Sequence, residues 1–285
     1  MEYSTVISPC APRYELLGPL ALKVGDEDVA PTAPRLRAVL SLLVLNGNRV
    51  VPTAVLLREL WDYTPPVSAR GTLQGYVFHL RKLFEKVLGQ PSKHVARNVL
   101  LTHADGYLLR VATGQLDVSD FELLVEQGDF ALAAGDFYQA AEVLREALSL
   151  WRGPISDDWS HGAKMRAYAT KLDELKFRAL LMFVEATLCA GRHREMIGEL
   201  ASHVVEHPSE QMLHAMFMIA LHRSDRTSAA LATFRGLAER MRDDQGLEPS
   251  ARLRSLHRAL LMGDPLLDGL ELRIGSLLDV LAAKW

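Results

Sequence analysis

Residues 68–88 read SARGTLQGYVFHLRKLFEKVL, and this stretch decides the fold expected for the first part of the chain. Ser68 stands where an N-cap residue belongs, shortly after the helix-breaking pair Pro65-Pro66, and Gly89 follows the stretch. Apolar side chains recur at the spacing of one helix face, at Leu73, Val77, Leu80 and Phe84. The stretch therefore predicts an amphipathic helix with these four side chains in the core.

The opposite face of this helix combines positive charge, hydrogen-bonding side chains and an aromatic ring. At about 100° per residue, the face carries Gly71, Gly75, Phe78, His79, Lys82 and Lys86. Lysine and arginine on such a face would neutralise phosphates, and polar side chains would reach base edges or sugars of DNA. The candidate DNA-contacting residues are Arg70, Thr72, Gln74, Tyr76, His79, Arg81 and Lys82, with His103 in a hairpin that follows.

Two glycines on the exposed face, Gly71 and Gly75, are unusual inside a helix. Each costs roughly 1 kcal/mol of helix stability relative to alanine, which suggests that something approaches the helix closely. The DNA backbone is the candidate. A competing interpretation is that any solvated helix turns its lysines and arginines outward, so the elements on either side of the helix have to be considered.

Those neighbouring elements predict a winged helix with an extra amino-terminal sheet. Residues 14–30 alternate short apolar runs with turns and indicate two or three strands. Two amphipathic helices follow, one from Arg35 to the turn at 46–48 and one with Pro52 in its first turn. After the third helix, residues 99–102 and 107–111 form a hairpin through Asp105-Gly106. Three helices before a hairpin are typical of a helix-turn-helix core.

The chain becomes helical from about Val118 and contains an internal repeat. Residues 134–144, 190–200 and 224–234 align, and the last two segments start 34 residues apart, the tetratricopeptide period. Stacked helix pairs of this kind leave a concave face for partners. The expected fold is mainly α with a small α+β part. The expected divisions are a flexible terminus at 1–13, a winged helix at 14–111, a linker at 112–117, the repeat domain at 118–265, and a helical extension at 266–285.

Charge divides unevenly between the two predicted domains. The net charge is −3, yet residues 1–113 hold 13 basic and 9 acidic residues, and the remainder holds 19 and 26. A basic amino-terminal domain followed by an acidic domain is consistent with nucleic-acid binding by the first domain. The two cysteines indicate no disulfide framework. With no leader sequence and no apolar run of ~18 residues, we expect a cytoplasmic protein without a membrane partner.

One motif points to a different class of function. The segment 203–207 has the H-x-x-E-H form of inverted zinc peptidases, which place His203 and His207 on one helix face. A third ligand is missing from the pattern, Pro208 ends the helix, and the segment lies inside the repeat array. We therefore expect no enzyme, no metal and no cofactor. The other alternative is a helical-repeat scaffold that does not bind DNA and whose basic head docks an acidic protein.

Several ordered motifs together resemble the Streptomyces antibiotic regulatory protein family. In the first part these are LLGPL at 16–20, VV at 50–51, LRELW at 57–61, TLQGYVFHLRKL at 72–83 and GYLL at 106–109. In the second part they are LSLWRGP at 148–154 and GLEPS at 246–250. The resemblance covers about residues 14–267. No G-x-x-x-x-G-K-[ST] loop is present, so the long ATPase-bearing members are not close relatives.

The resemblance implies an OmpR-like winged helix joined to a tetratricopeptide-like bacterial transcriptional activation domain. It also implies a transcription activator of a secondary-metabolite (antibiotic) gene cluster. Such a protein binds double-stranded promoter DNA at direct repeats as a side-by-side pair of protomers and recruits RNA polymerase holoenzyme, including sigma. The family's recognition surface falls on Thr72, Gln74, Tyr76, His79, Arg81 and Lys82. The sequence departs from the family at Gly75, where larger residues are usual, and at Phe78 and His79, which replace more polar or basic residues.

Overall fold

The computed structural model describes residues 12–62, 64–155, 162–270 and 272–284. The chain packs into two compact units. The first contains the residues through Leu123 together with Ala147–Lys176, and the second contains Leu124–Glu146 together with the residues from Phe177 onward. The division falls inside three helices, so each of those helices contributes residues to both units.

The first unit begins with a three-stranded antiparallel sheet and the three predicted helices. The sheet has the order β1-β2-β3, and its strands are β1 (Arg13–Glu15), β2 (Ala21–Val24) and β3 (Glu27–Asp28). The helices are α1 (Pro34–Leu45), α2 (Thr53–Trp61) and α3 (Ala69–Leu88). The mainly helical fold class with a small amino-terminal sheet is therefore confirmed.

The structure corrects the predicted start of α2 and confirms the N-cap position of α3 without its side-chain hydrogen bond. Pro52 precedes α2 as an extended N-cap residue instead of lying in its first turn, because it pairs in the short strand β4 (Val51–Pro52). Ser68 occupies the N-cap position of α3, but its side chain makes no capping hydrogen bond. Its backbone is already helical, with φ −80° and ψ 0°, and its carbonyl accepts the Thr72 amide at 2.9 Å. The helix α4 (Ser92–Asn98) was not predicted at all.

The predicted hairpin is confirmed, although its glycine has a different role. Strands β5 (Leu100–Thr102) and β6 (Gly106–Leu109) pair antiparallel in a sheet of order β4-β6-β5. The turn is Ala104-Asp105, since the His103 amide donates to the Gly106 carbonyl at 2.8 Å. A Cβ at Gly106 would collide with the backbone carbonyl of Val51. Glycine is required there because β4 approaches closely.

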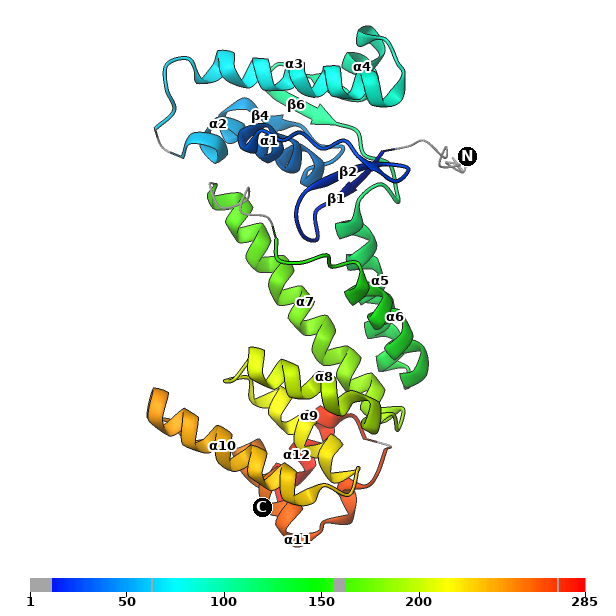
Figure 1. The fold of residues 1–285 in the computed structure, drawn as a ribbon, viewed down its shortest axis with the longest axis vertical. Coiled ribbons are helices and arrows are strands. Elements are labelled where there is room, and N and C mark those ends of the chain that lie inside the picture. Colours follow the sequence, from blue (N-terminus) through cyan, green and yellow to red (C-terminus); the bar gives the residue numbers. More distant parts are fainter. Residues whose placement is uncertain (1–11, 63, 156–161, 271, 285) are drawn as a thin grey trace. The chain divides into compact units, whose positions relative to one another are not determined.

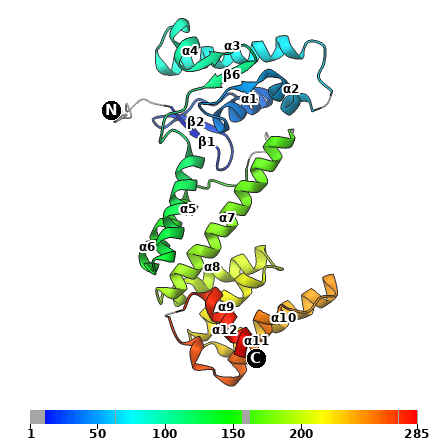
Figure 2. The same cartoon turned by 180° about the vertical axis from the view of Figure 1, so that it is seen from behind.

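The four apolar residues predicted for the core of α3 are buried. Leu73, Val77, Leu80 and Phe84 are each at most 2% exposed. Figures 1 and 2 show α3 along the side of β6, with α1 and α2 on the other side and the first part of α7 (Ala163–Cys189) beyond them. The outer face of α3 therefore points away from the part of α7 that belongs to this unit.

The internal repeat forms the same structure three times, a helix–turn–helix. Each repeat begins at the turn between two helices: α5 (Asp117–Ala133) and α6 (Phe137–Ser149), α7 and α8 (His193–Glu206), and α9 (Gln211–His222) and α10 (Thr227–Gln245). The second residue of each repeat is left-handed, with φ of 79° at Gly135, 76° at Gly191 and 61° at Asp225. The tetratricopeptide-like pattern in the sequence therefore marks a recurring backbone turn.

The remaining helices complete the second unit. The helix α11 (Ala251–Met262), a short 3-10 turn at Pro265–Leu267 and α12 (Ile274–Lys284) follow α10. The helix α12 packs against α11 and buries Ile274, Leu277, Leu278 and Leu281. Within the described parts of the chain, no helix combines the length and apolar character that crossing a membrane requires.

Candidate nucleic-acid interface

The outer face of α3 presents most of the predicted DNA-contacting residues to solvent. Arg70, Gln74, His79 and Lys82 are exposed, and Thr72, Tyr76 and Arg81 are half-buried. His103 is exposed at the start of the turn between β5 and β6. One helix thus carries seven of the eight candidates, and the hairpin carries the eighth.

Arg81 joins α3 to the hairpin. Its Nε and Nη2 donate to the Leu100 carbonyl at 3.0 and 2.8 Å, and Nη2 also donates to Thr102 Oγ1 at 2.8 Å. A guanidinium has five N–H donors, so these contacts leave only the Nη1 pair for another partner. The main role of Arg81 in this structure is to fix the hairpin beside the helix, which no local sequence pattern indicated.

Tyr76 is held in place by an aromatic stack. Its ring lies parallel to the Trp61 ring of α2, with centroids 6.5 Å apart and an interplanar angle of 17°. The Arg35 guanidinium lies over the other ring of this pair, 5.4 Å from the Trp61 centroid. The stack favours one orientation of the Tyr76 ring before any ligand arrives, which reduces the side-chain entropy lost on binding.

One ring nitrogen of His79 is hydrogen-bonded to the backbone of its own helix. Its Nδ1 lies 2.7 Å from the Gly75 carbonyl oxygen. Because a carbonyl can only accept, Nδ1 must carry the hydrogen, and in the neutral ring Nε2 is then an acceptor. In the major groove, the amino groups of adenine and cytosine are the donors that fit such an acceptor.

Lys82 combines an ion pair with an aromatic contact. Its Nζ donates to Glu85 Oε2 at 2.8 Å and lies 5.7 Å from the centre of the Phe78 ring. The hydrogen bond from Lys82, followed by one from Ser92, lowers the pKa of Glu85. The ammonium group of Lys82 has three donors, so donors remain for a phosphate.

The two glycines of α3 are not explained by packing within the protein. A Cβ placed on Gly71 or Gly75 would have no heavy atom within 4 Å. Neither residue has a left-handed backbone conformation. These positions could hold alanine without a clash in the free protein, so packing within the chain does not require glycine there.

A second group of polar residues lies inside the first unit, where β1 and β2 meet the start of α5. The Asp117 carboxylate accepts the amides of Leu16 at 2.8 Å and Leu17 at 2.9 Å. The Arg152 guanidinium lies 4.0 Å from Asp117 and 3.3 Å from Glu15. Burial raises the pKa of Asp117, and the amide hydrogen bonds and Arg152 oppose this shift.

Glu59 of α2 caps the amino terminus of α7. Its Oε2 accepts the amides of Lys164 at 3.0 Å and Met165 at 3.1 Å, and the residue is 2% exposed. A Cβ at Gly162 would collide with the same carboxylate. Sequence reasoning missed both Glu59 and Asp117, because the amides they bind lie about a hundred residues away along the chain.

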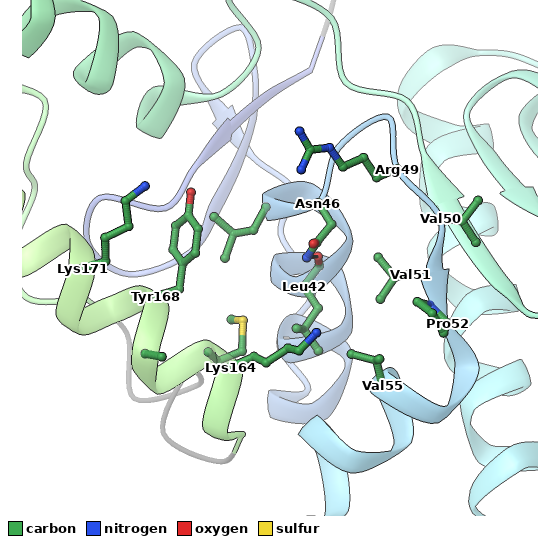
Figure 3. Close-up of a pocket in the computed structure, with 13 residues that line it drawn as sticks. Leu42, Asn46, Arg49, Val50, Val51, Pro52, Val55, Lys164, Tyr168 and Lys171 are labelled. Carbon is green, nitrogen blue, oxygen red and sulfur yellow. Dashed lines mark hydrogen bonds between the residues drawn. The ribbon is translucent and has the colours of Figure 1, made fainter.

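A cavity of about 490 Å³ lies on the α7 side of the winged helix. Figure 3 shows Lys164, Tyr168 and Lys171 on α7 across from Leu42 and Asn46 on and after α1. Lys171 is paired with Glu122 at 3.0 Å. Since α3 lies on the opposite side of the winged helix, this cavity is separate from the candidate interface.

The histidines of the H-x-x-E-H segment do not share a helix face. The helix α8 ends at Glu206, so His207 lies beyond it, and its ring packs 4.9 Å from that of Phe177. His203 Nδ1 lies 3.2 Å from Glu206 Oε2. Among the described residues, no three histidine, cysteine, aspartate or glutamate side chains are grouped to hold a metal.

Comparison with known proteins defines the class of this protein. The family description "Bacterial transcriptional activator domain" matches residues 116–261, and "Transcriptional regulatory protein, C terminal" matches residues 27–110. The fold and both domains therefore define a transcription regulator with an OmpR-type winged helix.

The relatives specify the family. The regulatory protein DnrI of Streptomyces peucetius is 40% identical over 90% of this chain and 94% of its own length. The transcriptional regulator RedD of Streptomyces coelicolor is 31% identical over 88% of this chain and 71% of its own. The chain belongs to the Streptomyces antibiotic regulatory protein family, which confirms the resemblance found in the sequence.

A solved structure supports the same conclusion. The transcriptional regulatory protein EmbR of Mycobacterium tuberculosis is 36% identical over 89% of this chain, which spans 64% of EmbR. The structure of EmbR in complex with a low affinity phosphopeptide has a TM-score of 0.83, with 34% identity over 96% of this chain and 69% of that one. The family consists of transcription regulators, not enzymes.

Proposed function

We propose that this protein is a sequence-specific DNA-binding transcription activator that reads the major groove with α3. The observation that carries the proposal is the outer face of α3. It exposes Arg70, Gln74, His79 and Lys82, while the opposite face is buried in the core of the winged helix. Cations that can reach phosphates and polar groups that can reach base edges are therefore presented together on one rigid element.

The side chains divide into roles according to their contacts. Arg70 and Lys82 neutralise phosphates, and Thr72, Gln74, Tyr76 and His79 reach base edges or sugars. Arg81 positions the hairpin through its bonds to Leu100 and Thr102. The hairpin in turn holds His103 towards the adjacent minor groove.

The activating half of the function belongs to the helical repeats. We propose that the protein binds promoter direct repeats as two protomers side by side and recruits RNA polymerase holoenzyme, including sigma. The target promoters would be those of a secondary-metabolite (antibiotic) cluster, and the protein would act in the cytoplasm on the nucleoid. Membership in a family of transcription activators and the similarity to DnrI support this proposal.

The test is genome-wide footprinting with the intact protein, followed by titration of one enriched promoter fragment at increasing salt. We expect a repeated motif in the bound promoters and an affinity that falls linearly in log salt with a slope of several units. A scrambled duplex of equal length is the control and should bind more weakly. Absence of enriched promoters and of salt-dependent DNA binding would contradict the proposal and favour the scaffold alternative.

A further inference from the structure

Phe78 is an exposed apolar residue on an otherwise polar surface. Its side chain is 57% exposed on α3 and does not belong to the buried stripe. It has an edge-to-face contact with His79, with centroids 5.8 Å apart, and Lys82 lies over its ring. Neither contact shields the ring from water, so the free protein gains little hydrophobic stabilisation from it.

The position of Phe78 beside the two glycines makes its ring accessible to a flat partner. Gly71, Gly75 and Phe78 lie on one face of α3 at spacings of four and three residues. The Phe78 ring contacts His79 and Lys82 and leaves Gly75 uncovered. Since nothing lies within 4 Å of a Cβ at either glycine, α3 can approach a groove floor with the ring as its most prominent contact there.

The major groove offers such a ring one matching chemical group. Every base edge there presents hydrogen-bond donors or acceptors, and the C5-methyl of thymine is the only methyl group. A phenyl ring has no donor or acceptor, and covering a polar base edge with it would remove water without supplying a replacement. We propose that Phe78 is a specificity-determining residue that selects thymine through its C5-methyl, an inference that rests on the proposed DNA-binding function.

The test replaces thymines of a bound half-site, one at a time, with deoxyuridine, which lacks only the methyl group. Burying one methyl corresponds to about a fourfold change in affinity, so we expect one or two positions at which deoxyuridine weakens binding by roughly that factor. With Phe78→Ala, the same positions should bind thymine and deoxyuridine equally. With Phe78→Leu, part of the preference should remain.

Matched controls separate this role from general effects. Lys82→Ala should weaken binding but keep the preference for thymine, because a phosphate contact does not sense the methyl group. Phe78 is exposed, so Phe78→Ala should unfold at the same temperature as the unmodified protein. Far-ultraviolet circular dichroism verifies this before binding is measured.

Three outcomes would overturn the inference. Sequence-specific binding that is insensitive to deoxyuridine at every position would show that no methyl is read. A preference for thymine that persists in Phe78→Ala would assign the reading to another residue. Equal loss of affinity on both duplexes would assign the ring to sugar or to a neighbouring protomer. By contrast, failure of the unmodified protein to bind any promoter would contradict the proposed function itself.

Discussion

The polar groups on the outer face of α3 are exposed to solvent, whereas those in the contact between the winged helix and α7 are hydrogen-bonded within the chain. In the contact with α7, Glu59 uses a buried carboxylate oxygen to accept two amides of the chain itself. On α3, Arg70, Gln74 and His79 are exposed to solvent. Polar groups that are satisfied within the chain stabilise the fold, whereas exposed groups on a rigid helix are available to a ligand.

The glycines repeat this difference. Gly106 and Gly162 are required by the fold, because a Cβ at either would collide with Val51 or Glu59. A Cβ at Gly71 or Gly75 would have no heavy atom within 4 Å. Gly71 and Gly75 serve no internal contact and also lie on the candidate DNA-binding face of α3. The following predictions test whether that face is approached closely from outside, from the largest expected effect to the smallest.

Replacing Glu59 should have the largest effect on stability. Glu59→Ala leaves the buried Met165 amide and the part-buried Lys164 amide of α7 without their acceptor, and we expect the free energy of unfolding to fall by about 2–4 kcal/mol. Urea denaturation followed by circular dichroism measures this loss. Glu122→Ala, which breaks an exposed ion pair with Lys171, is the control and should cost less than about 1 kcal/mol. Equal losses in the two variants would show that the Glu59 cap contributes no more than a surface pair.

Replacing Gly75 should separate stability from binding. Gly75→Ala should raise the free energy of unfolding by up to about 1 kcal/mol and weaken DNA binding about tenfold, since the new methyl group keeps the helix from the groove. Gly236→Ala in α10, where a Cβ would also meet nothing, is the matched control. It should gain stability and leave DNA affinity unchanged. Unaltered DNA binding by Gly75→Ala would show that α3 does not approach the groove closely at this position.

Tyr76 and His79 should affect specificity more than overall affinity. Each replacement by alanine should reduce the ratio of specific to nonspecific binding by about 1–3 kcal/mol, the range for a base contact. Competition between the promoter site and a scrambled duplex measures the ratio. Equal losses on both duplexes would show that these side chains contact the backbone instead of bases.

Asp117 should make the stability of the winged-helix unit depend on pH. Because burial raises its pKa in the folded protein above 3.8, the folded state binds the proton more tightly than the unfolded state. The stability that this protonation contributes is fully present below the unfolded pKa and is lost as pH rises through the folded pKa. The free energy of unfolding of the protein, minus that of Asp117→Asn, should therefore decrease as pH rises through this window. A difference that increases with pH would show that folding lowers the pKa of Asp117 instead of raising it.

Lys82 should have the smallest effect, visible mainly in the salt dependence. Lys82→Ala should lower the slope of log affinity against log salt by about one unit if its ammonium neutralises one phosphate. Lys164→Ala, on α7 at the other side of the winged helix, should leave the slope unchanged. An unchanged slope for Lys82→Ala would place this side chain outside the interface.

Local patterns in the sequence predicted much of this architecture. Three of these patterns correspond to structure: the helical spacing from Leu73 to Phe84, the repeat whose second residues are Gly135, Gly191 and Asp225, and the hairpin whose second strand contains Tyr107. Each depends on residues close in sequence, so propensity and spacing are sufficient to reveal it. The helix α4 was missed because only Val95 in it is buried, and one apolar residue defines no period.

The sequence by itself determined that α3 is an amphipathic helix with a basic, glycine-containing outer face, and that paired helices follow it. Only the tertiary structure decided which polar groups on and around that helix are already used. Arg81 binds the Leu100 carbonyl, and Glu59 and Asp117 bind amides about a hundred residues away. The physical reason is that helix periodicity depends on residues that are close in sequence. The partner of a long-range hydrogen bond depends instead on which distant backbone groups the folded chain brings together.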